Sequence, residues 1–217
     1  MHRSGAGYII PRGITLDRMK KKSISKLIIF LLIVIGAAAV MIGVRLRNGV
    51  QIKAGQTAMM PQEVAVYRQD DMRWAQDALG DSSYTMESSG CLTTCIASAV
   101  SMGYGDKVTP GELNTLFSVN NVYDGEGNIQ WTAIEKIGGY KVEIYADVTN
   151  EEIDRCLIDG HYPIVRVRMH GVGNFHYVLI VGIEDGDYIC MDPLENELTK
   201  LSRYFNRVYA LRIIMRE

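Results

Sequence analysis

Hydrophobic and polar positions divide the chain into three stretches with different patterns. From Leu27 to Val44 the sequence LIIFLLIVIGAAAVMIGV contains no charged residue, and its eighteen residues lie at the lower limit for a helix that spans a bilayer. Residues 45–62 are mostly polar and predict a linker that ends beside Pro61. From residue 63 to residue 217 shorter apolar patterns alternate with turn residues, which is typical of a globular domain.

The first half of the globular stretch has the period of helices. In residues 91–102 the apolar side chains recur at i, i+3, i+4 and i+7, at Leu92, Cys95, Ile96 and Ala99. Thr109 and Glu112 form a capping-box pattern that opens a helix to about Phe117, with Pro110 at its first position.

Two further short helices are predicted from their stop and start signals. Residues 128–139 fit a helix that Gly138 and Gly139 end. Thr149 and Glu152 form a second capping-box pattern, which starts a helix that ends near Gly160.

The second half of the globular stretch reads as strands joined by short turns. Strand-like segments cover residues 141–146, 162–169, 175–183, 187–192 and 208–215. Helices followed by strands predict an α+β domain, in which a helical half packs on a mostly antiparallel sheet. One transmembrane helix is expected to precede it.

Charge is divided unequally between the two parts of the chain. Residues 1–60 hold ten of the 23 Lys and Arg residues and one of the 25 Asp and Glu residues, a net charge of +9, which leaves −11 for the remainder. An acidic domain argues against nucleic acid as a partner, because phosphate binding needs a cationic surface.

The basic residues cluster before the apolar segment and predict its orientation. Lys20, Lys21, Lys22 and Lys26 favour a cytoplasmic amino terminus. The expected organisation is therefore a basic cytoplasmic segment (1–26), a single-pass signal anchor (27–44) in the lipid bilayer, a linker (45–62) and an extracytoplasmic domain (63–217).

A cleaved signal peptide is an alternative to the retained anchor. The small residues Ala37 and Ala39 fit a signal-peptidase site after a short apolar core. Cleavage there would release a secreted domain, so both interpretations place the domain outside the cytoplasm.

The stretch SSGCLTTCIASAV places two cysteines at the start of a predicted helix. Cys91 follows Gly90 in the first turn, where free backbone N–H groups and the helix dipole favour a thiolate. Cys95 lies on the apolar stripe and is expected to be a buried core residue. Position alone leaves Cys91 equally compatible with a nucleophile and with a small buried side chain.

A nucleophilic thiol needs a base, and the chain has four histidines. His2 lies on the other side of the expected membrane, His161 in a turn, and His170 beside a flexible loop. His176 begins a long strand, and Asp192 follows sixteen residues later, after a hairpin turn. A hairpin brings the two strand ends side by side, so Asp192 is expected to orient the ring of His176.

Other site chemistry has weaker signals. Gln69 precedes the Cys91 helix, and its amide is a candidate oxyanion donor beside the Cys91 backbone N–H. Cys91 and Cys95 have no second ligand pair nearby, so no metal site is expected. A disulfide between Cys156 and Cys190 is conceivable outside the cell, but the sequence does not support it.

The residues in the order YRQDDMRWA, SSGCLTTCIASAV and NFHYVLIVGIEDGDYICMDP resemble the papain-like cysteine peptidases, specifically the bacterial family related to double-glycine leader (bacteriocin-processing) peptidases. The resemblance covers about residues 65–217. It implies a papain-like fold with nucleophile Cys91, base His176, orienting Asp192 and oxyanion donor Gln69. Leu92 and Thr93 depart from the glycine and proline common after the family's cysteine. With no Walker motif, the resemblance does not extend to the ATP-transporter segments.

The sequence therefore predicts a membrane-anchored cysteine peptidase that acts on peptides or proteins without a cofactor. Two alternatives remain open. A transglutaminase-like or acyltransferase-like thiol enzyme uses the same three residue types in the same order. A catalytically silent module of this fold would bind peptides or cell-wall material.

Overall fold

The computed structural model describes residues 14–55, 57, 59–104 and 107–216, and it divides into two units, Met1–Arg47 and Asn48–Glu217. His2 and the rest of the predicted basic segment before residue 14 lie outside the described residues. The first unit contains the helix α1 (Ile14–Leu46).

Helix α1 is apolar on every side along its second half. Large side chains such as Leu27 and Phe30 are exposed rather than packed in a core. Within the described residues, Lys26–Leu46 is the one stretch of helix long and apolar enough to cross a membrane. The predicted apolar helix is confirmed, and it is compatible with a membrane anchor or a signal sequence.

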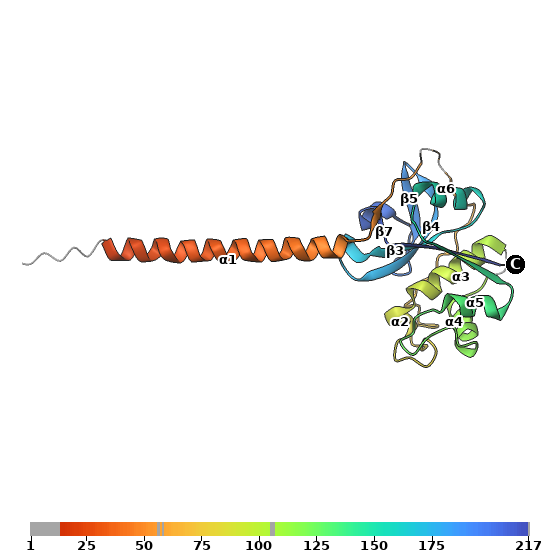
Figure 1. The fold of residues 1–217 in the computed structure, drawn as a ribbon. Helices are drawn as coiled ribbons and strands as arrows, with labels where there is room; N and C mark the ends of the chain where they lie inside the picture. Colours follow the sequence, from red (N-terminus) through yellow and green to blue (C-terminus); the bar gives the residue numbers. More distant parts are fainter. Residues whose placement is uncertain (1–13, 56, 58, 105–106, 217) are drawn as a thin grey trace, which may run out of the picture. The chain divides into compact units, whose positions relative to one another are not determined.

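The second unit is a mixed α and β domain built on antiparallel sheets (Figure 1). Within the described residues its main sheet has six strands in the order β2-β8-β3-β4-β5-β6, and a smaller sheet pairs β1 with β7. The strands are β1 (Val50–Gln51), β2 (Tyr140–Tyr145), β3 (Ile164–Arg168), β4 (Phe175–Glu184), β5 (Asp187–Met191), β6 (Thr199–Lys200), β7 (Arg207–Val208) and β8 (Ala210–Arg216).

Five helices of the second unit accompany these strands in the described part of the chain, and two short 3-10 turns, Met169–Gly171 and Leu201–Tyr204, complete it. The helices are α2 (Met86–Ser89), α3 (Cys91–Tyr104), α4 (Pro110–Val119), α5 (Trp131–Ile137) and α6 (Asn150–Ile158). The capping box of Thr109 and Glu112 is confirmed at α4, and Gly138 ends α5 with a positive φ of 83°. The antiparallel α+β architecture predicted from the sequence is therefore confirmed.

Two hydrophobic cores lie on the two faces of the main sheet. Leu179 and Val181 of β4 belong to the core shared with α3, α4 and α5, whereas Val178 and Ile180 belong to the core on the other face. Figure 1 shows α2, α3, α4 and α5 gathered on one side of the domain, with α6 on the other. Strand β4 is buried on both faces, so its apolar run is nearly continuous.

The predicted linker over residues 45–62 is partly wrong, because residues 50–54 belong to the domain. Strand β1 pairs with β7 in the register Val50 to Val208. Ile52 and Ala54 are buried in the second core. Their alternation with exposed residues is that of a half-buried strand, which the polar composition of the segment concealed.

Gly182 allows the segment before Pro61 to lie close to β4. Met59 and Ile183 exchange two backbone hydrogen bonds of 2.7 and 2.8 Å. A Cβ atom at Gly182 would overlap the carbonyl oxygen of Met59, a backbone atom that cannot move without breaking this bridge.

We expect Gly182→Ala to lower the free energy of unfolding by about 1–3 kcal/mol, because the added methyl group overpacks this contact. Gly125→Ala is the matched control, since nothing lies within 4 Å of the Cβ that it would add. Urea unfolding of the full chain in detergent micelles, followed by tryptophan fluorescence, measures both. Equal stabilities of the two variants would contradict the close approach of Met59.

Candidate active site

Cys91 is placed at the amino terminus of α3 by a sharp change of direction after α2. Thr85 and Ser88 cap the start of α2 reciprocally. The chain then turns at Gly90, where a Cβ would overlap the backbone of Met86, so glycine is required there. Cys91 follows and is half-buried, whereas Cys95, one turn later, is completely buried. The predicted contrast between the two cysteines is confirmed in their burial.

The hairpin predicted between His176 and Asp192 is present as β4 and β5. Its two-residue turn has positive φ at Asp185 (53°) and Gly186 (74°), as a type I′ turn requires. His176 is the second residue of β4, and Asp192 directly follows β5.

A β-bulge in β4 decides which face of the sheet Asp192 occupies. On the side of the hairpin turn, Gly182 pairs with Ile189. On the other side of the bulge, Ile180 pairs with Cys190, so the register has shifted by one residue. Side chains opposite each other share a face, so without the shift Asp192 would lie opposite Leu179 in the first core. With the shift, Asp192 shares the face of Val178 and therefore of His176.

His176 and Asp192 form a buried pair. The ring Nε2 lies 2.7 Å from Asp192 Oδ1, and the side chains are only 5% and 2% exposed. The backbone N–H of Leu194 donates to the same carboxylate oxygen at 2.9 Å, and the hydroxyl of Tyr204 donates to Oδ2. Asp192 is therefore fixed by three donors.

The other side of the imidazole faces the thiol. His176 and Cys91 line the same cavity, and Cys91 as well as Asp192 acts to raise the pKa of His176. Because Asp192 occupies Nε2, Nδ1 is the nitrogen left for Cys91. The ring is thus bound to the carboxylate after β5 and shares a cavity with the thiol at the start of α3.

Neighbouring polar groups decide the pKa of His176. Burial alone would lower this pKa, but the interactions of the ring with Asp192 and Cys91 outweigh it and raise the pKa to about 9. Burial likewise acts to raise the pKa of Asp192, and the bonds from His176, Tyr204 and Leu194 keep it below the usual range. These interactions therefore favour the protonated form of the ring.

Gln69 lies in the same site with a different hydrogen bond from the one expected. Its backbone N–H donates to Pro193 at 2.9 Å, which ties it to the residue after Asp192. Its side-chain amide is buried and donates to the backbone carbonyl of Glu87 at 2.6 Å, while Oε1 has no partner. One amide N–H remains for another acceptor.

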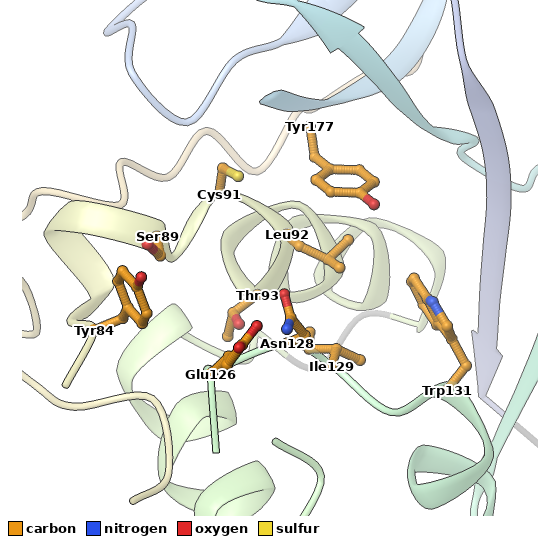
Figure 2. Close-up of a pocket in the computed structure, with 11 residues that line it drawn as sticks. Tyr84, Ser89, Cys91, Leu92, Thr93, Glu126, Asn128, Ile129, Trp131 and Tyr177 are labelled. Atoms are coloured by element: carbon orange, nitrogen blue, oxygen red, sulfur yellow. The ribbon is translucent and has the colours of Figure 1, made fainter. Parts of the chain in front are cut away.

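Two cavities meet at Cys91. One, of about 400 Å³, is lined by Gln69 and His176; the other, of about 290 Å³, is lined by Leu92 and Trp131. Cys91, Ser89 and Tyr177 line both cavities. Figure 2 shows the 290 Å³ cavity, with the sulfur of Cys91 at its edge. The thiol is thus accessible from a cleft that continues on both sides of it.

The structure brings together Cys91, His176, Asp192 and Gln69 and keeps the other described histidines apart. His161 lines a separate cavity with Tyr145 and Cys156. His170 lies in a turn with a positive φ of 49° and lines neither cavity at Cys91. The catalytic roles of the four assembled residues stay predictions.

Tyr204 is a site residue that the sequence analysis missed. It lies in the 3-10 turn Leu201–Tyr204, and its ring is buried in the second core. No pattern of neighbouring residues marks a tyrosine that reaches a carboxylate twelve positions earlier. Only the path of the chain after β6 brings it there.

The remaining cysteines and acidic residues form no second centre. Cys156 and Cys190 are buried free thiols, so they do not pair here. Within the described residues, no group of three or more His, Cys, Asp or Glu side chains is arranged to hold a metal ion.

Comparison with known proteins gives no independent assignment. No family model matches the chain, and no curated protein matches it. The papain-like resemblance therefore stays a prediction from the motifs.

The raised pKa of His176 predicts a pH-dependent part of the stability. A group whose pKa is higher in the folded state stabilises the fold fully below its unfolded pKa, near 6.5, and this contribution is lost as the pH rises through about 9. Between pH 7 and pH 10 the free energy of unfolding of the wild type should therefore fall by about 2–3 kcal/mol more than that of His176→Gln. Urea unfolding of both proteins measures this difference, and parallel pH curves would contradict the raised pKa.

Removing the Tyr204 hydroxyl, which donates a hydrogen bond to Asp192, should lower the stability of the fold. Tyr204→Phe leaves Asp192 Oδ2 buried without this donor, and the free energy of unfolding should fall by about 1–3 kcal/mol. Tyr84→Phe, at an exposed ring, is the control and should change stability little. A Tyr204→Phe protein as stable as this control would show that the bond contributes nothing.

Proposed function

We propose that this protein is a membrane-anchored cysteine peptidase with a papain-like fold, whose domain acts outside the cytoplasm. One observation carries the proposal: His176 lies 2.7 Å from Asp192 in a buried pair and lines the same cavity as the accessible thiol of Cys91. A pair of this kind is costly to bury, and a thiol with an adjacent imidazole is the arrangement that nucleophilic thiol catalysis needs.

The proposed reaction passes through a thioester. The Cys91 sulfur, as a thiolate, attacks the peptide carbonyl carbon and forms a carbon–sulfur bond. Imidazolium His176 gives its proton to the leaving amine as the carbon–nitrogen bond breaks. The neutral ring then takes a proton from water, whose oxygen attacks the thioester carbon. The carbon–sulfur bond breaks, which releases the acid product and restores the Cys91 thiolate beside imidazolium His176. No cofactor takes part in these steps.

Gln69 is proposed to stabilise the oxyanion of the tetrahedral intermediate. Its hydrogen bond to Glu87 fixes the amide plane and leaves one N–H free to donate. Preorganised donors of this kind stabilise charge that develops in the transition state. The backbone N–H of Cys91, at the amino end of α3, is the expected second donor.

The proposed location follows from α1 and its flanking charges. Lys26 begins the stretch that is apolar enough to cross a membrane, and more basic residues precede it in the sequence. Retention of basic residues on the cytoplasmic side would expose the domain on the opposite side. Its substrates would then be extracytoplasmic peptides or proteins.

A matched pair of cysteine variants tests the proposal. The full chain in detergent is incubated with a library of peptides of mixed sequence, and new termini are counted by mass spectrometry. Cys91→Ala should abolish cleavage and Cys95→Ala should retain it, because only Cys91 reaches the cleft. His176→Ala should lower the rate by at least about 100-fold.

Two results would reject hydrolysis in favour of the alternatives. Products that carry an added primary amine, when that amine is supplied, would indicate acyl transfer. A wild-type protein that cleaves no peptide, and whose Cys91 is alkylated at the rate found in His176→Ala, would indicate a silent binding module.

A further inference from the structure

Three arginines lie on the face of the main sheet that packs against α3. Arg166 and Arg168 alternate along β3 with valines buried in the second core, so they point to the first. Arg212 of β8 lies opposite Ile164, a residue of the first core. We call Arg166, Arg168 and Arg212 the cationic wall.

The guanidinium groups of the cationic wall contact aromatic rings. Arg166 and Arg168 both lie over the ring of Phe175, with Cζ 4.3 and 3.9 Å from its centroid. Arg212 lies 5.9 Å from the ring centroid of Trp131. Stacking of this kind orients a guanidinium while leaving its N–H edge available to an anion.

Within the described residues, the cationic wall has no acidic partner. Among the ion pairs of the described residues, none involves these three arginines. The hydrogen bonds of Arg168 and Arg212 go to the backbone carbonyls of Gly173 and Leu211. The Nε atoms of Arg166 and Arg168 are buried and unpartnered. Burial and the charge of Arg166 both lower the pKa of Arg212, as expected where like charges crowd together.

The aromatic residues that contact the cationic wall also line the cleft at Cys91. Phe175 and Tyr177 line the 400 Å³ cavity with Cys91, and Tyr177 and Trp131 line the 290 Å³ cavity. Figure 2 shows Tyr177 and Trp131 on the side of the latter cavity away from Glu126. The cationic wall contacts aromatic residues on one side of the cleft without lining either cavity itself, and Glu126 lines the other side, although residues 61–217 are acidic in total.

We propose that the cationic wall selects substrates that carry a carboxylate within a few residues of the bond cut by Cys91. This inference rests on the proposed function, since it assigns the substrate class of the same cleft. A guanidinium fork binds a carboxylate through two parallel hydrogen bonds, and it would supply the counter-charge that the described residues lack. The carboxylate is either an Asp or Glu side chain or a free carboxyl terminus.

Three alkylating probes test this selection without requiring peptide cleavage. N-iodoacetyl-glutamate α-amide carries a side-chain carboxylate, N-iodoacetyl-glutamine carries a free α-carboxylate, and N-iodoacetyl-glutamine α-amide is neutral. Alkylation of Cys91 in the full chain in detergent is followed by mass spectrometry, and each rate is divided by the rate with glutathione. At least one acidic probe should react about 10-fold faster than the neutral probe, and which one does so identifies the source.

Variants connect the preference to the cationic wall. Arg166→Gln/Arg168→Gln should bring the acidic and neutral probes to equal normalised rates, and Arg166→Lys/Arg168→Lys, which keeps charge without the fork, should give an intermediate ratio. Lys107→Gln removes one exposed positive charge elsewhere and should leave the ratio unchanged. Thermal unfolding confirms that each variant is folded.

The outcomes separate the two proposals. Acidic probes that react no faster than the neutral one in the wild type would overturn the carboxylate selection, whatever the peptide library shows. A normal preference for acidic probes with no cleaved peptide would overturn the peptidase activity alone. If peptides are cleaved, their sites should hold Asp, Glu or a carboxyl terminus at one fixed position.

Discussion

The one-residue bulge in β4 is the constraint on which the candidate site depends. Strand β4 divides the domain into two cores, and its side chains alternate between them until the bulge near Gly182. The shift turns Asp192 toward the face of His176, where the second core surrounds the pair. A regular hairpin of the same sequence would bury the carboxylate on the opposite face, away from His176.

Burial of the pair is offset by hydrogen bonds from several elements. Asp192 receives donors from β4, from the chain after β5 and from the turn at Tyr204. These bonds replace the water that a buried carboxylate loses, and they explain why its pKa stays low although burial acts in the opposite direction. The site is thus fixed by hydrogen bonds on the side of His176 and Asp192 and open on the side of Cys91.

Much of the fold could be predicted because its signals are local. The capping box at Thr109 and the stop at Gly138 each fix a helix end within a few residues, and the turn at Asp185 and Gly186 fixes the hairpin that pairs His176 with Asp192. Such signals depend on backbone conformation that the residue types themselves favour.

The features that escaped prediction depend on contacts between distant residues. The run YVLIVGI in β4 is apolar throughout, so its sequence does not fix the register or reveal the bulge. The pairing of β1 with β7 joins residues almost 160 positions apart. The amide of Gln69 donates to the carbonyl of Glu87 only in the folded domain. The three arginines of the cationic wall also meet only when β8 returns beside β3.

The order of the site residues along the chain has a consequence for biosynthesis. Every partner that would activate Cys91 is made after it, because His176, Asp192 and Tyr204 all lie toward the carboxyl terminus. A chain still emerging from the ribosome, or threading unfolded across a membrane, carries this thiol without its base. The proposed activity would therefore be switched on by completion of the fold itself, with no need for a removable inhibitory segment to keep the growing chain harmless.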